Sequence, residues 1–275
     1  MRGSYGKVEF NYSGKEIFNR RSGNRLMFPV EIPRFRETIS NQILAALPAE
    51  ELAKLLPFAE SADFSAGENI YQPDDKVRYV YFPETTVFSQ LQILEDGNTS
   101  EVGMVGSEGV IGLQAIIGFP TANCWTETRV AGRALKISTE IINREFNGNG
   151  SLRAQILGYL NAYIEQIFQK AVCNSHHRLK ERFCNWLLML QDRKKSNKFS
   201  LTQEQIARVM GVNRPSFSCI ALELRQKGII HYSRGKIVIL DRQALEKAAC
   251  SCYSGEIKNA FFINNFKKSL KLIAA

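Results

Sequence analysis

One stretch of the chain, residues 201–240, constrains its fold more than any other: LTQEQIARVMGVNRPSFSCIALELRQKGIIHYSRGKIVIL. Thr202 and Gln205 have the spacing of a capping box, in which each side chain satisfies a backbone amide of the other. The apolar residues that follow give the short helix one buried stripe, and Gly211 is suited to end it. We therefore expect a helix of about two turns that stops sharply at Gly211.

A second helix and a hairpin are predicted directly after that stop. Asn213 is placed to cap the helix, and Pro215 is tolerated in a first turn because amides there have no intrahelical partner. Two β-rich runs, residues 229–232 and 236–240, are joined by Ser233-Arg234-Gly235. Helix, tight turn, helix and hairpin in this order predict a winged helix-turn-helix, for which duplex DNA is the expected partner.

The positive charge of the chain is concentrated in the same region. Residues 176–240 hold 13 Lys and Arg against 4 Asp and Glu, while the remaining residues hold 23 of each kind. A basic surface beside phosphates releases counterions and thereby gains affinity for nucleic acid. Two alternatives stay open: a small helical subdomain without a ligand, and an effector-binding regulatory module that acts on a protein partner. A steep loss of affinity with salt would distinguish DNA binding from docking through apolar faces.

Length and composition bound the remaining possibilities. The 275 residues are enough for two domains, and no apolar run approaches the ~18 residues that a membrane span requires. Without the apolar stretch of a signal peptide, a cytoplasmic location is expected. Residues 1–40 are basic and rich in Gly, Asn and Arg, so we expect a flexible arm. We find no nucleophile elbow, phosphate-binding loop or dinucleotide fingerprint, and predict no enzymatic activity.

The cysteines give no metal-binding pattern in the sequence. Six are scattered along the chain: Cys124, Cys173, Cys184, Cys219, Cys250 and Cys252. Cys250 and Cys252 are the one close pair, and a single intervening residue is too tight for the usual structural zinc site. His176-His177 precedes a predicted helix and is interpreted as part of a hinge between domains. The sequence thus predicts free thiols and no metal site.

The first half of the chain changes from helical to β-rich character. Residues 43–58 predict a helix, whereas residues 63–136 contain short runs of Val, Ile, Tyr, Phe and Thr separated by turn pairs. The strand candidates are residues 77–82, 86–94, 124–130 and 134–137. Several short strands at this spacing predict an all-β barrel or jelly roll.

A long helix is predicted over residues 152–172, between the two regions. Its apolar positions recur every 3.5 residues or so, and we predict that they form a dimer interface: Leu152, Ile156, Tyr159, Tyr163 and Ile167. A two-fold protein would match a two-fold DNA site. The alternative is a helix packed on its own barrel. Residues 178–191 predict a further helix in the core of the DNA-binding region, and Asp241 is placed to cap a last one.

This arrangement resembles the Crp/Fnr-type transcription regulators over about residues 41–253. The similarity is most specific in LTQEQIARVMGVNR, LRQKGIIHYSRGKIVILDR and AACSCY, and weaker in EVGMVGSEGVIGLQ. It implies an α+β protein with a cyclic-nucleotide-binding-like β-barrel sensor domain (41–150), a dimerisation helix (151–175) and a winged helix-turn-helix domain (176–253), with a tail from 254 to 275. It also implies a homodimer, a double-stranded DNA operator, RNA polymerase and a small-molecule or protein effector as partners.

The departures from the family pattern concern the effector. In cyclic-AMP-binding members the glycine-rich turn is followed by a Glu, and an Arg-Ser or Arg-Thr pair further on holds the phosphate. Here Gly112 is followed by Leu113-Gln114, and residues 121–125 read TANCW, without a cation to clamp a phosphate. Arg129 is the nearest arginine and is expected on the next strand. We therefore expect no cyclic-AMP clamp, an unknown effector and no cofactor. Iron–sulfur-binding members use N-terminal cysteines, and this sequence has no cysteine before Cys124. Haem-binding members use a histidine of the sensor domain, whereas the three histidines here are His176, His177 and His231.

The resemblance also places the DNA-contacting side chains. The positions that match the family's recognition helix begin at Arg214, which can donate two hydrogen bonds to guanine O6 and N7. The Glu and Arg that many relatives carry further along are replaced here by Pro215 and Cys219, so we expect base contacts from Arg214, Ser216 and Ser218. The expected phosphate contacts are Thr202, Gln203 and Arg234, at the start of the first helix and in the wing turn.

Overall fold

The computed structural model of the chain describes residues 9–10, 17–18, 25–26 and 39–253. The chain divides into two units, Met1–Thr38 and Ile39–Ala275. In the first unit, β1 (Glu9–Phe10), β2 (Ile17–Phe18) and β3 (Arg25–Leu26) pair as an antiparallel sheet. The predicted flexible arm (residues 1–40) lies mostly outside the described residues. The predicted tail from residue 254 lies outside them entirely.

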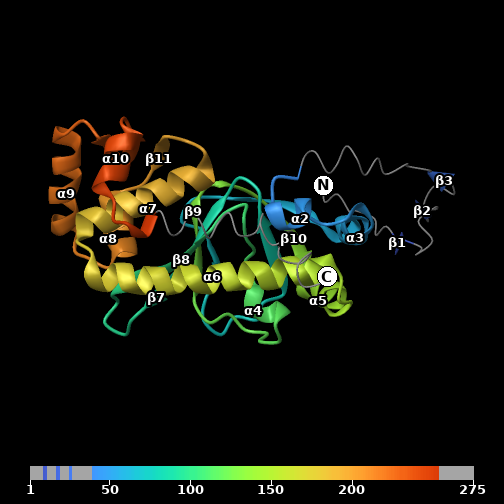
Figure 1. Cartoon of the computed structure of the whole chain (residues 1–275). Coiled ribbons are helices and arrows are strands. Elements are labelled where there is room, and N and C mark those ends of the chain that lie inside the picture. Colours follow the sequence, from blue (N-terminus) through green and yellow to red (C-terminus); the bar gives the residue numbers. More distant parts are fainter. Residues whose placement is uncertain (1–8, 11–16, 19–24, 27–38, 254–275) are drawn as a thin grey trace, which may run out of the picture. The chain divides into compact units, whose positions relative to one another are not determined.

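Two antiparallel sheets form the part of the second unit that the sequence predicts as a sensor domain, and we keep that name for it below (Figure 1). One has the strand order β4 (Glu60–Phe64), β10 (Gly132–Ser138), β6 (Tyr79–Pro83). The other has the order β5 (Asn69–Tyr71), β9 (Trp125–Val130), β7 (Val87–Ile93), β8 (Thr99–Val105). Val80, Phe82, Phe88 and Ala134 are fully buried in the core of this region. The predicted jelly-roll fold is confirmed, with two sheets that are not closed into one barrel.

The helix predicted over residues 43–58 is wrong as a single element. The structure divides it into α2 (Gln42–Ala45), α3 (Ala49–Leu55) and a 3-10 turn (Leu56–Phe58). Pro48 causes the break, because proline disfavours a helical conformation in the residue before it and lacks an amide hydrogen. Two further short helices, α4 (Leu113–Ile116) and α5 (Thr139–Asn147), were not predicted.

The long helix α6 (Ser151–His176) begins at an unusual cap. Gly150, its N-cap residue, has no side chain to satisfy the first amides. Glu51 of α3 does so instead: its two carboxylate oxygens accept from the backbone N–H groups of Ser151 at 2.9 Å and Leu152 at 3.0 Å. A Cβ at position 150 would lie 2.9 Å from a Glu51 oxygen, so the glycine makes room for this contact. The carboxylate thereby fixes where α6 starts relative to the sensor domain.

The predicted dimer residues of α6 belong to the core of the chain itself. Leu152, Ile156 and Tyr159 are at most 4% exposed and pack in the sensor core, which Tyr163 also contacts. The apolar residues that α6 leaves exposed lie on another face: Leu157, Ile164, Phe168 and Val172. A dimer interface on α6 stays a prediction. The residues available for it are this exposed stripe and not the buried set.

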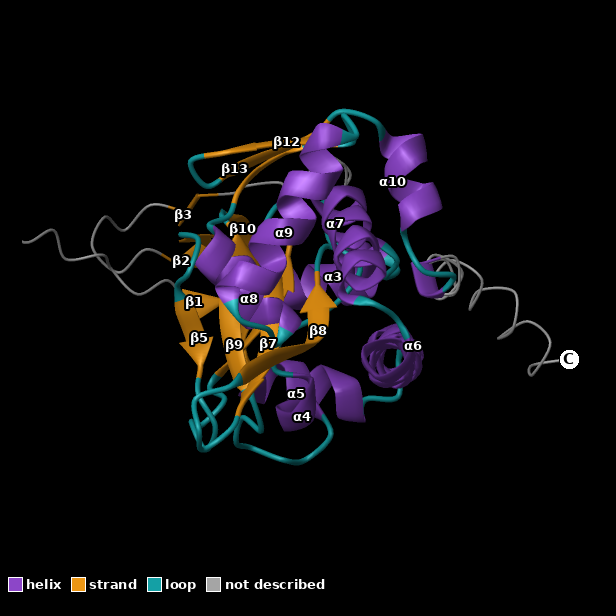
Figure 2. Cartoon of the chain, turned by 90° about the vertical axis from the view of Figure 1, so that its left-hand side faces the viewer, coloured by secondary structure: helices purple, strands orange, loops and turns teal. Residues whose placement is uncertain are grey.

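The C-terminal region has the predicted winged helix-turn-helix order (Figure 2). Its elements are α7 (Leu179–Lys194), β11 (Lys198–Ser200), α8 (Gln203–Met210), α9 (Arg214–Gln226), β12 (Ile230–Ser233), β13 (Lys236–Ile239) and α10 (Arg242–Ala248). Phe183 and Phe217 pack edge to face in its core, with ring centroids 4.9 Å apart. The short strand β11, which was not predicted, joins the wing in a three-stranded sheet. None of the helices in the described ranges is long and apolar enough to cross a membrane.

Candidate nucleic-acid interface

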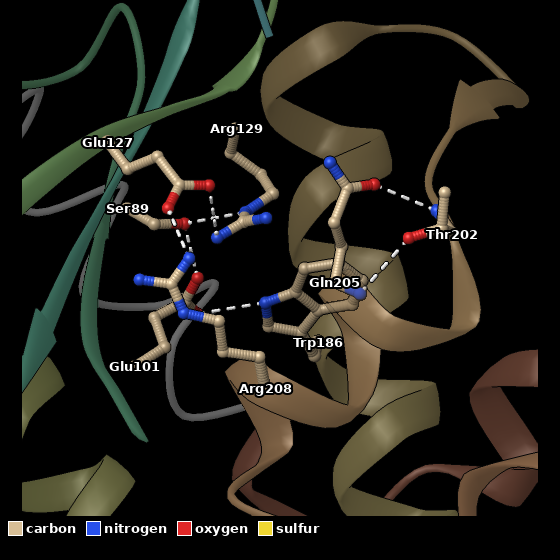
Figure 3. A network of polar contacts seen from close by, with 8 residues as sticks. All are labelled: Ser89, Glu101, Glu127, Arg129, Trp186, Thr202, Gln205 and Arg208. Carbon is tan, nitrogen blue, oxygen red and sulfur yellow. Dashed lines mark hydrogen bonds and ion pairs between the residues drawn. The ribbon is translucent and has the colours of Figure 1, made fainter. Parts of the chain in front are cut away.

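The turn between α8 and α9 is built by local hydrogen bonds. Thr202 Oγ1 accepts from the backbone N–H of Gln205 at 3.2 Å, and Gln205 Oε1 accepts from that of Thr202 at 2.8 Å (Figure 3). Gly211 ends α8 with a φ of +66°, in the left-handed region that favours glycine. The side chain of Asn213 then accepts from the amide of Ser216 at 2.9 Å and caps α9. The capping box, stop and second cap are all confirmed.

The first turns of α9 present the predicted base-contacting residues. Arg214 and Ser216 are exposed and Ser218 is half-buried. Gln203 Oε1 accepts from Ser218 Oγ at 2.8 Å and from Arg214 Nε at 3.4 Å. Gln203, predicted as a phosphate contact, therefore orients two of the three side chains predicted to contact bases, and its role toward phosphate remains a prediction.

The wing turn brings Arg234 close to the start of α8. Arg234 and Gly235 have φ values of +48° and +72°, the pattern of a two-residue type I′ hairpin, and Arg234 is exposed. The amide of Leu201 donates to the carbonyl of Gly235 at 2.7 Å, and the Tyr232 hydroxyl donates to the carbonyl of Leu201 at 3.0 Å. These bonds hold the wing against the residue that precedes Thr202. The predicted phosphate contacts from two separate elements are thus brought to one edge of the domain.

Part of the positive surplus pairs with carboxylates of the sensor domain. Arg208 of α8 pairs with Glu127 of β9 at 3.2 Å, and Arg193 of α7 pairs with Glu108 at 2.7 Å. Both arginines neutralise sensor carboxylates, and the Arg193 side chain is largely buried at 11% exposure, whereas that of Arg208 is 44% exposed. The charge excess counted from the sequence therefore overstates what the described interface offers to nucleic acid.

A buried polar network joins the winged helix to the sensor sheet (Figure 3). Glu101 of β8 is 1% exposed, and its Oε1 accepts from the indole Nε1–H of Trp186 at 2.9 Å. Ser89 donates to the other oxygen of Glu101, and Lys170 of α6 lies 3.6 Å from the carboxylate. Because an unpaired buried carboxylate is costly, the network ties α7 to this place on the sheet.

A cavity of about 370 Å³ lies between the sensor strands and α6. Its lining consists of Gln90, Gln92, Val102, Val110, Gly112, Leu113, Gln114, Ile117, Asn123, Cys124, Leu160, Tyr163, Ile164 and Ile167. None of these described residues is acidic or basic. Burial raises the pKa of the Cys124 thiol to about 11 and that of the Tyr163 phenol well above its ordinary value, so both stay neutral. The cavity therefore offers amides, a phenol and apolar surface, but no charge.

The residues of the expected clamp region line this cavity without supplying a cation. Gly112, Leu113 and Gln114 contribute from one side, and Asn123 and Cys124 from another. Arg129, named above as the nearest arginine, is 4% exposed and engaged elsewhere. Its Nε donates to Ser89 at 3.1 Å and its guanidinium pairs with Glu127 at 3.4 Å.

Sequence reasoning missed a cluster of sulfur and nitrogen atoms at the end of α6. Cys173, His177, Cys250 and Cys252 each place one potential metal-ligand atom within 4.8 Å of all the others. Spacing along the chain could not reveal it, because Cys173 and Cys250 are 77 residues apart. The prediction that Cys250 and Cys252 are too close for a zinc site considered that pair alone, whereas folding adds a second pair.

Comparison with known proteins agrees with the geometry of the interface. Residues 181–248 match the family model of the Crp-like helix-turn-helix domain. The C-terminal region of the chain is therefore a Crp-like helix-turn-helix domain. The fold over 70% of this chain is similar to that of FixK2 from Bradyrhizobium japonicum, of which it covers 98%, with a TM-score of 0.61 and 17% identity. No curated protein is matched by sequence.

Two further solved structures share the fold of this chain. A CRP-family transcriptional regulator from Thermus thermophilus, TTHB099, is 20% identical over 68% of this chain and 96% of its own, with a TM-score of 0.59. The c-di-GMP-responsive regulator CLP from Xanthomonas campestris is 17% identical over 70% of this chain and 100% of its own, with a TM-score of 0.57. At these identities the likeness concerns the fold, and the effector has to be argued from the residues of this chain.

Proposed function

We propose that this Crp/Fnr-type protein reads a specific operator through the first turns of α9 and holds the DNA backbone through the start of α8 and the wing. The observation that carries the proposal is the placement of Arg214 and Arg234. Arg214 is exposed at the N-terminal end of α9, and Arg234 is exposed in a turn fastened to the start of α8. An arginine at the first position suits guanine, and one at the second suits phosphate.

The test compares these two arginines on specific and scrambled DNA. An operator is first selected from a random duplex pool with the full-length protein. Arg214→Ala is expected to cost about 1–3 kcal/mol on this operator and to relax discrimination at one guanine per half-site. Arg234→Ala is expected to weaken both duplexes equally and to lower the salt slope by roughly one unit per half-site. Lys247→Ala, which removes an exposed charge from α10, is the matched control and should change neither quantity.

Equal losses on both duplexes for Arg214→Ala would assign Arg214 to the backbone and pass base reading to Ser216 or Ser218. If affinity does not fall with salt at all, the alternative of a module acting through protein contact takes over.

The protein acts as a dimer in this proposal, paired through the exposed stripe of α6. Leu157, Ile164, Phe168 and Val172 are between 40% and 66% exposed and follow one another by seven, four and four residues. That spacing keeps them on one side of the helix, as in a two-helix seam. A second copy of the chain is the occupant that fits, because a two-fold reader matches a two-fold operator.

The effector in this proposal is a small uncharged molecule that occupies the cavity beside α6. The support is the lining, where amides and apolar groups gather without a cation that could meet a phosphate bidentately. The Tyr163 hydroxyl donates to the Gln90 side chain within the cavity wall, so an entering polar group has to compete with or join this bond. Contact with RNA polymerase, implied by the family resemblance, remains a prediction.

A further inference from the structure

Two pairs of metal-ligand side chains meet where α6 ends. Cys173 and His177 are four residues apart in the last turn of α6 and at its C-cap, so they share one face of the helix. Cys250 and Cys252 follow α10 and flank a single residue. Folding places Cys173 Sγ 3.5 Å from Cys250 Sγ, and Cys252 Sγ 3.5 Å from His177 Nδ1.

These separations fit four ligands around one ion. Zinc binds thiolate sulfur at about 2.3 Å and imidazole nitrogen at about 2.0 Å, which places tetrahedral ligand atoms about 3.5–3.8 Å from one another. All four atoms here lie within 4.8 Å of each other, so sub-ångström movements of the side chains complete the geometry. The same compactness leaves no room between them for the several irons and sulfides of an iron–sulfur cluster.

The surroundings of the four side chains suit a thiolate site. The three cysteines are 3–7% exposed and form an apolar cluster of their own, separate from the two larger cores. The amide of Gln169 donates to Cys252 Sγ at 2.9 Å, and that of Asn185 faces Cys250 Sγ at 3.6 Å. Amide donors to sulfur stabilise thiolates and orient them toward a metal.

We propose that Cys173, His177, Cys250 and Cys252 bind one Zn²⁺ ion as a structural Cys3His site. Three thiolates and one imidazole in a closed tetrahedral set are the ligands of structural zinc, without an open position for catalysis. The ion would join the end of α6 to the segment after α10, directly at the junction where α6 passes into α7. It would thereby fix the winged helix-turn-helix domain on the helix that carries it. This proposal does not depend on which DNA or effector the protein binds.

The test begins with the metal content of the full-length protein, purified under reducing conditions. Elemental analysis is expected to find about one zinc per chain. Replacing zinc by Co²⁺ should give the intense visible bands of tetrahedral cobalt together with a thiolate-to-cobalt charge-transfer band. Cys252→Ser and His177→Ala should lose stoichiometric zinc, whereas Cys124→Ser and Cys219→Ser, which remove thiols elsewhere in the described chain, should keep it.

A variant of Gln169, which donates to a ligand sulfur, provides a graded readout in a protein that keeps all four ligands. Gln169→Leu removes the amide donor to Cys252 and should lower zinc affinity about 10–100-fold in competition with a chelator. The proposal is overturned if the reduced wild-type protein takes up neither Zn²⁺ nor Co²⁺, or if the metal it holds is unaffected by Cys252→Ser. It is equally overturned if the isolated protein shows iron–sulfur absorption, or a Cys173–Cys250 disulfide in place of the ion.

Discussion

The indole of Trp186 offers the sharpest test of the contact between the winged helix and the sensor sheet. Trp186 is 1% exposed, stacks near Phe183 with ring centroids 6.2 Å apart, and donates its N–H to Glu101. Replacing it with phenylalanine removes this donor from a carboxylate that is itself 1% exposed. Glu101 keeps Ser89 and Lys170 as partners, so one interaction is lost while the network persists.

The expected cost of Trp186→Phe follows from two contributions. A hydrogen bond to an ionised group contributes about 1.5–3 kcal/mol. The smaller ring also leaves roughly 40 Å³ unfilled, which costs about 1 kcal/mol at the usual ~24 cal/mol per Å³ of cavity. Together these predict that the free energy of unfolding falls by about 2.5–4 kcal/mol.

The measurement is urea unfolding followed by circular dichroism, with Trp125→Phe as the matched control. Trp125 is half-buried against the same apolar cluster, and none of the described hydrogen bonds involves its indole N–H. The control should therefore lose about 1 kcal/mol at most, since only apolar contact is removed. Each variant keeps one of the two tryptophans, whose fluorescence then reports on β9 or on α7 separately.

A double-mutant cycle isolates the hydrogen bond from the loss of volume. Glu101→Gln keeps an acceptor oxygen but removes the charge, so combining it with Trp186→Phe should recover part of the single-mutant costs as a coupling energy of about 0.5–3 kcal/mol. A coupling indistinguishable from zero, or a Trp186→Phe cost no larger than that of Trp125→Phe, would refute the reasoning about Glu101.

Three further predictions concern α6 and the cavity. Phe168→Glu places a charge in the exposed stripe and should give monomers in sedimentation at micromolar concentration, whereas Leu240→Glu, at a residue 60% exposed outside α6, should not. For Glu51, burial by itself raises the pKa, but hydrogen bonds from the backbone of Ser151 and Leu152 outweigh it and the net pKa is lowered. Its stabilising contribution is therefore present above the unfolded pKa of about 4.3 and lost as pH falls through the lower folded value. Glu51→Gln should lower the free energy of unfolding by about 0.3–1 kcal/mol at pH 7. It should also reduce the loss of that free energy at acid pH, measured by urea unfolding at a series of pH values. Calorimetry with cyclic AMP should give a Kd no tighter than about 1 mM, equivalent to about −4 kcal/mol, and a micromolar value would contradict the uncharged cavity.

The winged helix was predictable because its signals are local. The capping box of Thr202 and Gln205, the stop at Gly211 and the cap at Asn213 each act within a few residues, and each forms as expected. The wing follows the same rule, since a two-residue turn with Gly235 fixes the pairing of β12 with β13. The sensor strands were predicted less completely, and β8 was missed. Its sequence includes Glu101, a charged residue that is nevertheless buried because its partners come from other elements.

The face of α6 that contacts the sensor domain could not be read from periodicity. Apolar residues occur around most of this helix, so a nearly 3.5-residue spacing exists both for the buried set that includes Ile156 and for the exposed set that includes Phe168. Which set turns inward is decided by the anchoring of Ser151 through Glu51 and by the shape of the sheet beneath. The Cys173 and Cys250 cluster was hidden for a related reason, since its two halves are 77 residues apart in the sequence and meet only in the tertiary structure.

One side chain of α6, Ile164, lies at two surfaces at once. It lines the cavity, and at 40% exposure it is also part of the outward stripe. In the proposed function, a molecule that fills the cavity and a second chain that covers the stripe would both contact this side chain. We therefore expect the two binding events to be coupled through the rotamer and burial of Ile164. In that case the apparent affinity for the proposed effector changes with protein concentration, and by reciprocity the effector changes the proposed monomer–dimer equilibrium by the same factor.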